Sequence, residues 1–361
     1  MKLLVLRGNP RKSGHTQHFT DLFVQGARAA GAEVSDVDLM ERRIAPCRGC
    51  YHCWIVTPGQ CVHHDDMADL LSAFIAADVV VCATPLYYYS ASSRMQVFLE
   101  RTLPLTEAGL DTTLGGLSRN RTRYPTNWQG KKLIFLVVGA LREVENFRPF
   151  EATCRLIAEG LAMEFGGVLI RPESHLTCFA RAKPKAVKTL EASFVEAGME
   201  VARSGHIPER VLMRAAMPLA PSAAYFRNYS NIYWANAHEM GSGALKTDEL
   251  VSKVSKDARI LLPFMVSAMD PVATARTKAV LQFDFADTNA HYRSVIDCGT
   301  ACLTNEETSD PDLRISCAAE VWADIARGDL DPREALRQRL VTLAGDRSLF
   351  ARLSHFFPVV G

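Results

Sequence analysis

The first half of the chain alternates strand-like runs with stretches in which apolar residues recur at helical spacing. The strand-like runs lie at residues 3–6, 33–38, 78–83, 132–138 and 167–171. The stretches with helical spacing lie at residues 16–30, 66–76, 93–101, 150–165 and 182–203. Parallel strands that are covered on both faces are apolar along their length rather than alternating. The pattern therefore predicts an α/β domain with a five-stranded parallel sheet between two layers of helices.

Five strands alternating with helices are typical of the flavodoxin-like doubly wound fold. The strand order is expected by analogy with that fold, because the pattern itself does not determine it. In such sheets, ligands bind beyond the carboxyl ends of the strands, where the strand order reverses. Site residues are therefore expected in the loops that follow the strands.

The pattern changes near residue 240, where Gly241-Ser242-Gly243 forms a short break. Period-two runs at 279–285 and 291–297 flank turn-forming residues, which is typical of a β-hairpin. A further strand is expected at 313–317, and helices are expected at 318–327, 332–336 and 348–356. We therefore expect an α/β domain over residues 1–240 and a smaller α+β domain with an antiparallel sheet over residues 245–361.

Composition and charge narrow the classes of function. The chain has 361 residues, 48% of them hydrophobic, and a formal net charge of +1, which argues against nucleic-acid binding driven by charge. No run reaches the roughly 18 uncharged apolar residues that a membrane span needs. The N-terminus shows no signal-peptide pattern. We therefore expect a cytoplasmic protein whose ten cysteines are reduced thiols or metal ligands.

The loop after the first strand predicts an anion site. It runs Gly8-Asn9-Pro10-Arg11-Lys12-Ser13-Gly14-His15-Thr16 and contains no acidic residue. Cationic and hydroxyl donors, together with the free N–H groups at the start of a helix, suit a phosphate monoester. The loop is neither a Walker loop nor a dinucleotide fingerprint. A basic surface turn is the competing interpretation.

Two further loops complete a predicted ligand site. The third strand is followed by Pro85, Leu86 and three tyrosines, Tyr87, Tyr88 and Tyr89, which offer a flat wall for a planar ring. The fourth strand ends at Gly139, where a ligand can approach the backbone closely. A phosphate site beside an aromatic wall favours a phosphorylated heteroaromatic ligand, of which FMN is the simplest. Tyrosines that are buried against a helix are the competing interpretation.

Four cysteines, Cys47, Cys50, Cys53 and Cys61, lie within 15 residues of one another. Such spacing allows one loop to surround a metal centre. Three interpretations stay open: a [4Fe–4S] cluster on all four thiols, a zinc ion on three of them with His63 or His64, and thiols without metal. Of the neighbouring residues, Asp65 and Asp66 are expected to cap the following helix, and Arg101 is expected to pair with a carboxylate.

Four motifs occur in order along the chain. They are Gly8-Asn9-Pro10-Arg11-x-x-Gly14-x-Thr16, Cys47-x-Gly49-Cys50-x-x-Cys53, Asp65-Asp66-Met67 and Pro85-Leu86-Tyr87-x-x-x-Ala91-x-x-x-Met95-x-x-Phe98-x-x-Arg101. This series resembles the NAD(P)H-dependent FMN reductases, and especially their iron–sulfur flavoprotein branch, over residues 1–235. The resemblance implies that the FMN phosphate binds at Asn9, Arg11, Ser13, His15 and Thr16. It also implies that residues 85–89 and the Gly139 loop frame the flavin ring, and it implies no catalytic side chain.

The second domain resembles the sterol carrier protein type-two family over residues 245–358. The resemblance rests on Val280-Leu281-Gln282-Phe283-Asp284, Asp310-Pro311-Asp312, Ile315-Ser316, Trp322-Ala323-Asp324-Ile325-Ala326-x-Gly328 and Leu343-Ala344-Gly345-Asp346. It implies an apolar tunnel for a lipid, lined by Trp322, Ile325, Leu340, Leu349, Leu353, Phe356 and Phe357. A filled core that serves only in dimerisation is the competing interpretation. Gln338-Arg339 stands where the family has small residues, which argues against an open tunnel.

Together these features predict a flavin oxidoreductase that passes electrons from NAD(P)H to a quinone-like or other hydrophobic small molecule. The C-terminal domain would bind a lipid or the substrate. One alternative is an iron–sulfur electron carrier with a redox protein partner, and another is a non-catalytic lipid-binding protein. The resemblance also implies a homo-oligomer.

Overall fold

The computed structural model describes residues 1–113, 115–125, 128–179, 184–220, 223, 226–227, 230–231, 258–267, 269–270, 272–326 and 328–357. The chain forms two compact units. The first comprises Met1–His175 and Val187–Pro218, and the second comprises Leu176–Ala186 and Leu219–Gly361. The domain boundary predicted at residues 240–245 lies outside the described residues. No helix in the described part of the chain is long and apolar enough to cross a membrane.

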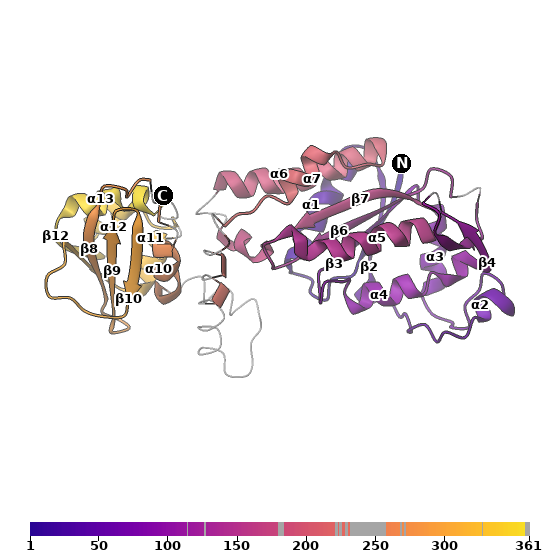
Figure 1. Ribbon diagram of the computed structural model, residues 1–361, viewed down its shortest axis with the longest axis horizontal. Coiled ribbons are helices and arrows are strands. Elements are labelled where there is room, and N and C mark those ends of the chain that lie inside the picture. Colours follow the sequence, from indigo (N-terminus) through magenta and orange to yellow (C-terminus); the bar gives the residue numbers. More distant parts are fainter. Residues whose placement is uncertain are drawn as a thin grey trace. The chain divides into compact units, whose positions relative to one another are not determined.

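A five-stranded parallel sheet forms the centre of the first unit (Figure 1). Its strands are β1 (Lys2–Arg7), β2 (Glu33–Asp38), β3 (Val79–Pro85), β6 (Lys132–Val138) and β7 (Glu164–Arg171), in the order β2-β1-β3-β6-β7. Val5 of β1 pairs with Asp36 of β2 and with Val81 of β3. The strand order reverses at β1, as it does in a doubly wound sheet. The predicted flavodoxin-like fold class is confirmed.

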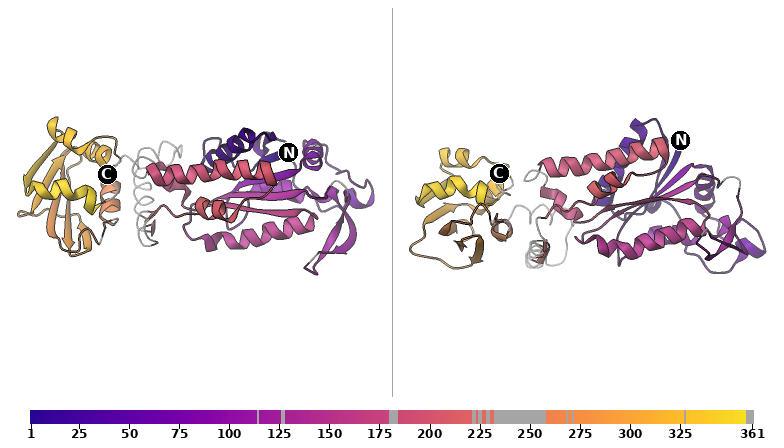
Figure 2. Two further views of the ribbon diagram at one scale, coloured as in Figure 1. Left: turned by 90° about the horizontal axis from the view of Figure 1, so that it is seen from above. Right: turned by 45° about the horizontal axis from the view of Figure 1, so that its top comes forward.

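Helices cover both faces of this sheet. The core on one face includes residues of α3 (Met67–Ala76), α4 (Ser93–Glu100) and α5 (Arg148–Gly160). The other face carries α1 (His15–Ala29) with α6 (Pro184–Ser204) packed on it, so the sheet lies between α6 and α5 in both views of Figure 2. The short helix α7 (Glu209–Ala215) packs against β7.

Two glycines allow α1 and α6 to cross in contact. A Cβ atom on Gly26 would lie 1.9 Å from the carbonyl oxygen of Val195, and a Cβ on Gly198 would lie 1.9 Å from that of Phe23. Beside the crossing, the rings of Phe19 and Phe194 lie 4.5 Å apart. Only glycine leaves room for backbones at this distance.

The predicted helix at residues 150–165 is wrong at its C-terminal end. The helix α5 ends at Gly160, and Glu164 and Phe165 already belong to β7. Ala162 has a φ of 58°, a left-handed conformation that stops the helix and turns the chain into the strand. Phe165 then pairs with Leu133 of β6.

Several short elements of the first unit lie in connections that the periodicity did not predict. An antiparallel hairpin of β4 (Thr106–Thr112) and β5 (Ser118–Thr122) precedes β6, after the 3₁₀ helix η2 (Leu103–Leu105). The remaining short helices are η1 (Leu39–Glu41), α2 (His52–Ile55) and η3 (Val144–Phe147). A further one, η4 (Ser174–Phe179), begins in the first unit and continues in the second. Of these, α2 packs against η2 and β4, which places the cysteine loop beside the base of the hairpin.

The second unit is a five-stranded sheet with helices. Its strands, in the order β10-β9-β8-β11-β12, are β8 (Lys278–Phe285), β9 (Ala290–Asp297), β10 (Thr300–Thr304), β11 (Leu313–Cys317) and β12 (Val341–Gly345). Over described residues 258–357, its helices are α10 (Ala258–Ser267), α11 (Ala319–Ala326), α12 (Pro332–Arg337) and α13 (Arg347–Phe356). The prediction of an antiparallel sheet is wrong for one pair, because β11 pairs with β8 in parallel. The unit is nevertheless α+β.

Candidate functional site

The loops after β1, β3 and β6 meet at one edge of the first sheet, because these strands are neighbours and run in parallel. The first loop is tied to the second. The backbone N–H of Gly8 donates to the carbonyl of Ala83 at 2.8 Å, and the hydroxyl of Ser92 donates to the carbonyl of Gly8 at 2.5 Å. A Cβ on Gly8 would lie 2.8 Å from the Cβ of Met95. The start of α4 therefore holds the first loop in place.

The first loop presents a cation to the positive end of α1. The guanidinium of Arg11 folds over Gly14, the N-cap of α1, with its Nε 3.5 Å from the position of a Cβ there. The first turn of α1 contains no acidic residue. Arg11 forms no salt bridge within the described residues, whereas Lys12 pairs with Glu41 at 2.5 Å on the surface. A cation and free helix N–H groups at one point attract an anion.

Buried polar residues hold this loop in place through hydrogen bonds. Asn9 is buried, and its Nδ2 donates to the carbonyl of Arg11 at 2.8 Å and to Gln17 Oε1 at 3.2 Å. The Oδ1 atom of Asn9 is buried and has no donor among the described residues. Thr16 is also buried. Ser13 lies in the loop, and His15 is the first residue of α1. The burial of Asn9 and Thr16 does not fit a simple surface turn.

The tyrosines after β3 form a tight turn whose side chains are exposed. Tyr87 and Ser90 exchange two backbone hydrogen bonds, of 2.9 and 3.0 Å. Tyr88 and Tyr89, between them, have φ angles of 48° and 61°, which are strained for bulky residues. Tyr88 is fully exposed, and the other two are about half exposed. The interpretation that these side chains are buried against a helix is therefore wrong.

Gly139, after β6, is closely packed by the chain itself. A Cβ there would lie 2.7 Å from Cζ of Phe147 and 3.4 Å from the Cβ of Leu86. Leu86 is linked to the same strand end, because its N–H donates to the carbonyl of Val138 at 2.8 Å. Pro85, the last residue of β3, is buried. Gly139 therefore brings the second and third loops together.

All four predicted cysteine ligands line one small cavity of about 20 Å³. Cys53 is buried, Cys50 is exposed, and Cys47 and Cys61 are intermediate. Burial raises the pKa of the Cys53 thiol, and the three neighbouring thiols raise it further. The structure therefore brings the four thiols close enough to interact. The room among them is about that of one water molecule, so a larger group would require the exposed loop to open.

The spacing of the thiols does not match a bound zinc ion. Zinc–sulfur bonds of about 2.3 Å place tetrahedral sulfur ligands roughly 3.8 Å apart. Within the described residues, the one group of three histidine, cysteine or carboxylate ligand atoms mutually within 4.8 Å is elsewhere, at Asp284, His291 and Glu307. An iron–sulfur cluster holds its thiolates farther apart than a single zinc ion does. A mutual distance of 4.8 Å between ligand atoms therefore applies to the zinc site and not to a cluster.

Arg101 and Asp65 anchor the cysteine loop from within the fold. The two side chains form a bidentate pair of 2.8 and 3.0 Å, and Arg101 is buried. Both also hold Ala45, since Asp65 accepts its N–H at 2.9 Å and Arg101 donates to its carbonyl at 2.6 Å. Burial acts to raise the pKa of Asp65, but the hydrogen bonds from Arg101, Ala45 and Met67 outweigh it and lower that pKa to about 2. Asp65 caps α3 as predicted, whereas Asp66 makes no side-chain cap bond there.

The cysteine cavity contains polar atoms whose hydrogen bonds are not all satisfied. Arg101 and His63 line it together with the thiols. The Nε of Arg101 and the Nε2 of His63 are buried without a partner among the described residues. Burial without a partner is costly for such groups. An acceptor bound among the thiols would therefore suit this cavity.

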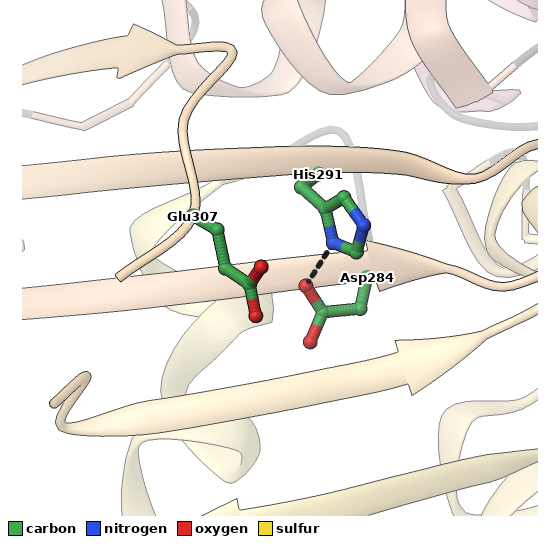
Figure 3. A group of neighbouring side chains, drawn as sticks. All are labelled: Asp284, His291 and Glu307. Atoms are coloured by element: carbon green, nitrogen blue, oxygen red, sulfur yellow. Dashed lines mark hydrogen bonds and ion pairs between the residues drawn. The ribbon is translucent and has the colours of Figure 1, made fainter. Parts of the chain in front are cut away.

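The group of Asp284, His291 and Glu307, which the sequence analysis missed, is an ion-pair network (Figure 3). His291 Nδ1 lies 2.8 Å from Asp284 Oδ1. Arg314 lies 2.7 Å from the other oxygen of Asp284 and 3.3 Å from Glu307. The guanidinium of Arg314 already supplies the positive charge that a metal ion would bring to these carboxylates.

The second unit contains a cavity of about 690 Å³. Three predicted tunnel residues, Trp322, Ile325 and Leu353, line it. Leu340 is exposed, and Leu349, Phe356 and Phe357 are buried but are not among the lining residues. Arg339 does not close the cavity but is one of its lining residues. Only four of its fifteen lining residues are buried, so the cavity is a surface depression with one buried side.

Comparisons with known proteins also divide the chain into an N-terminal and a C-terminal part. An NADPH-dependent FMN reductase family model matches residues 1–145, and an SCP-2 sterol transfer family model matches residues 267–358. An iron–sulfur flavoprotein of Archaeoglobus fulgidus is 30% identical over 168 residues, which cover 46% of this chain and 69% of the relative. An iron–sulfur flavoprotein of Methanosarcina thermophila is 27% identical over 128 residues, which cover 33% of this chain and 65% of the relative.

A solved structure of an NAD(P)H:quinone oxidoreductase from Methanothermobacter marburgensis aligns with 57% of this chain and 99% of its own, at 13% identity and a TM-score of 0.40. The family assignment rests on the Archaeoglobus relative and on the two family models. The chain therefore belongs to the iron–sulfur flavoprotein branch of the NADPH-dependent FMN reductases, and its residues 267–358 match the SCP-2 sterol transfer family.

Proposed function

We propose that the first unit binds FMN at the edge formed by the loops after β1, β3 and β6 and reduces a quinone-like or other hydrophobic acceptor with NAD(P)H. The observation that carries this proposal is the unpaired Arg11 at the N-terminus of α1, one strand away from the exposed tyrosine turn. An anion site beside an aromatic wall fits a phosphorylated flavin.

In this arrangement, each loop has a separate task. Arg11, Ser13, Thr16 and the helix N–H groups would hold the phosphate, with Asn9 and His15 completing the loop. The tyrosine turn and the Gly139 loop would frame the ring. FMN would supply the hydride and electron chemistry when bound, so no side chain needs to act as a base. Because the tyrosines are exposed, the face beside them is open to a nicotinamide and to an acceptor.

A second candidate function, electron transfer through a [4Fe–4S] cluster to a redox protein partner, is favoured by one observation. Cys47, Cys50, Cys53 and Cys61 line a single cavity, beside the buried guanidinium of Arg101. A thiolate-ligated cluster is anionic, and a fixed cation with an unused N–H would stabilise it.

The C-terminal domain is proposed to bind a lipid or the hydrophobic substrate. Its support is the cavity in the second unit, which falls within the size range of small-molecule sites. A cytoplasmic location and a homo-oligomer stay predictions.

The first test compares Arg11→Ala with Lys12→Ala in the full-length protein. Loss of the unpaired Arg11 is expected to weaken FMN binding roughly tenfold, because a charge-assisted hydrogen bond is worth about 1.5–3 kcal/mol. Lys12 is paired with Glu41 on the surface, so its loss is expected to change the affinity by less than about twofold. Fluorescence titration with FMN measures both. Equal effects of the two substitutions would contradict the proposed phosphate site.

Iron and acid-labile sulfide assays of the protein purified without oxygen separate the two candidate functions. The electron-carrier function requires both elements in the purified protein, whereas the oxidoreductase function does not. A protein that contains neither flavin nor iron, and that cannot be reconstituted with FMN, would favour the non-catalytic lipid-binding alternative.

A further inference from the structure

A groove of about 550 Å³ runs along α3 in the first unit. Its lining residues on the helix are residues 67, 68, 71, 72 and 75, whose spacing places them on one face of α3. The rest of the lining comes from the segment 59–65 of the cysteine loop, from Arg101, and from Leu105 and Tyr124 at the base of the hairpin. Among the described residues, none of those assigned above to the flavin lines this groove, which we call the α3 groove.

The floor of the α3 groove is apolar. Met67, Leu71 and Leu105 line it and are each at most 8% exposed. Tyr124 is partly buried, and its ring is held in place because it stacks on that of Trp128 at a centroid distance of 5.7 Å. A groove of this volume falls within the range of small-molecule sites, and such a floor suits an aromatic ring.

The inner end of the groove is polar. Cys61, His63 and Arg101 line both the α3 groove and the cysteine cavity, so they form the wall between the two. Arg101 is 2% exposed, and its Nε–H is buried without an acceptor among the described residues. The Nε2 atom of His63 is likewise buried without a partner there. Buried polar atoms without a partner are rare in folded proteins, so this wall favours a bound group that supplies one.

The two cavities that share this wall differ greatly in size. The cysteine cavity, of about 20 Å³, has room for one water molecule, whereas the α3 groove has room for an organic molecule. A molecule in the groove can therefore contact the shared wall without any opening of the cysteine loop.

The buried end of the groove carries no net charge for a ligand to balance. The guanidinium of Arg101 is paired with Asp65 at 2.8 and 3.0 Å. The two oxygens of Asp65 also accept the backbone N–H groups of Ala45 and Met67. An anion here would face the carboxylate and a cation would face the guanidinium, so either would lose hydration without gaining a free counter-charge. The groove therefore favours an uncharged ligand.

We propose that the α3 groove binds a small, uncharged aromatic ketone or quinone, with its ring on Leu71, Leu105 and Tyr124. The carbonyl oxygen accepts hydrogen bonds from Arg101 Nε and from His63 Nε2 in its protonated tautomer. One carbonyl oxygen has two lone pairs, so it satisfies both donors at once. This inference rests on the quinone-like acceptor proposed above and adds a binding site for such a molecule beside the cysteine loop.

The test uses the full-length protein and three ligands of similar size. Benzophenone has the rings and the carbonyl, diphenylmethane lacks the oxygen, and 4-benzoylbenzoate adds a negative charge. None of the three is reduced by a flavin, so equilibrium dialysis measures binding without turnover. Benzophenone is expected to bind about tenfold more tightly than either of the others, because only benzophenone gives the buried donors an acceptor without burying a charge.

Ser72→Trp and Asp69→Trp form a matched pair of variants on α3. Both positions are exposed, but only Ser72 lines the groove. Ser72→Trp is expected to weaken benzophenone binding at least tenfold, because its ring would fill the groove, whereas Asp69→Trp is expected to change it by less than about twofold. His63→Phe keeps a ring without a hydrogen-bonding nitrogen, and it is expected to reduce the advantage of benzophenone over diphenylmethane by about threefold or more.

Equal binding of benzophenone and diphenylmethane by the unaltered protein would overturn the inference, as would tighter binding of 4-benzoylbenzoate or no binding at all. Binding that Ser72→Trp leaves intact would also overturn it, because the site would then lie elsewhere in the chain. These outcomes are distinct from failure of the proposed oxidoreductase, which is tested by reduction of bound FMN with NADH or NADPH.

Discussion

At the scale of single residues, the pair of Arg101 and Asp65 shows how a functional loop is held by the core. Arg101 is buried, Asp65 is 11% exposed in its side chain, and both contact Ala45 at the start of the cysteine loop. Both residues lie in the motifs recognised in the sequence. The expected pairing of Arg101 with a carboxylate is confirmed. Its partner, Asp65, was not predictable, because the pair joins the start of α3 to the residue after α4 and depends on tertiary packing.

Asp65→Asn is expected to lower the free energy of unfolding by about 3 kcal/mol at neutral pH, because it leaves the buried Arg101 without its counter-charge. The pKa of Asp65 in the folded protein is about 2, below the ordinary aspartate value of 3.8. The stabilisation is therefore present above about pH 4 and is lost as the pH falls toward 2. Urea denaturation at pH 7 and near pH 3 measures this difference.

Asp66→Asn is the matched control for that substitution, since Asp66 pairs with an arginine whose side chain is 87% exposed. It is expected to cost less than about 1 kcal/mol at either pH. A loss for Asp65→Asn no larger than that of the control would show that the buried pair does not anchor the loop.

The tyrosine turn combines strained backbone angles with an exposed aromatic surface. Tyr88 is fully exposed with a φ of 48°, so Tyr88→Gly removes strain without removing packing. Without FMN, the variant is expected to be more stable by about 1 kcal/mol. With FMN, it is expected to bind more weakly. Thermal unfolding and FMN titration measure the two effects, and an unchanged FMN affinity would remove Tyr88 from the site.

At the scale of elements, the sequence predicts what has a local pattern. Four of the five strands of the first sheet were predictable as apolar runs, and β1 ends at a donor-rich loop. The edge strand β2 is mostly exposed and was predictable only from its position between two helical stretches. The hairpin of β4 and β5 was not, since most of its residues are exposed and neither strand shows a buried face. The parallel pairing of β11 with β8 joins strands far apart in sequence, which no local pattern shows.

The crossing of α1 and α6 gives a prediction at this scale. Gly198→Ala is expected to lower the free energy of unfolding by more than about 3 kcal/mol, because its Cβ would overlap the carbonyl of Phe23 and the backbones cannot separate without loss of packing. Gly160→Ala in α5 is the matched control, with no atom within 4 Å of the new Cβ.

The control is expected to be neutral or to stabilise by up to about 1 kcal/mol, since alanine favours helices. Chemical denaturation measures the free energy of unfolding of both variants. If Gly198→Ala were as stable as the control, the helices would not pack through these glycines.

At the scale of the whole molecule, the chain combines two units with separate candidate ligand sites. The anion loop and tyrosine turn lie in the first unit, and the cavity of about 690 Å³ lies in the second. The change in sequence pattern near residue 240 predicted two domains. The lining of the cavity was not predictable in full, because it combines residues of α11, α12, β12 and α13 that only the tertiary fold brings together.

Calorimetry of the full-length protein tests this division. A ligand stabilises only the unit that binds it, by about 2.7 kcal/mol at a concentration one hundred times its Kd. FMN is expected to raise the temperature of one unfolding transition, and a lipid such as hexadecanoate is expected to raise that of the other. A single transition that shifts equally with either ligand would contradict two separate sites.

The most direct test of the flavin assignment is the absorbance spectrum of the full-length protein reconstituted with FMN, recorded without oxygen before and after addition of NADH or NADPH. The account predicts that the visible flavin bands disappear on addition of one or both nucleotides and return when a quinone is added. Flavin bands that persist with either nucleotide, in protein shown to contain FMN, would contradict the proposed oxidoreductase.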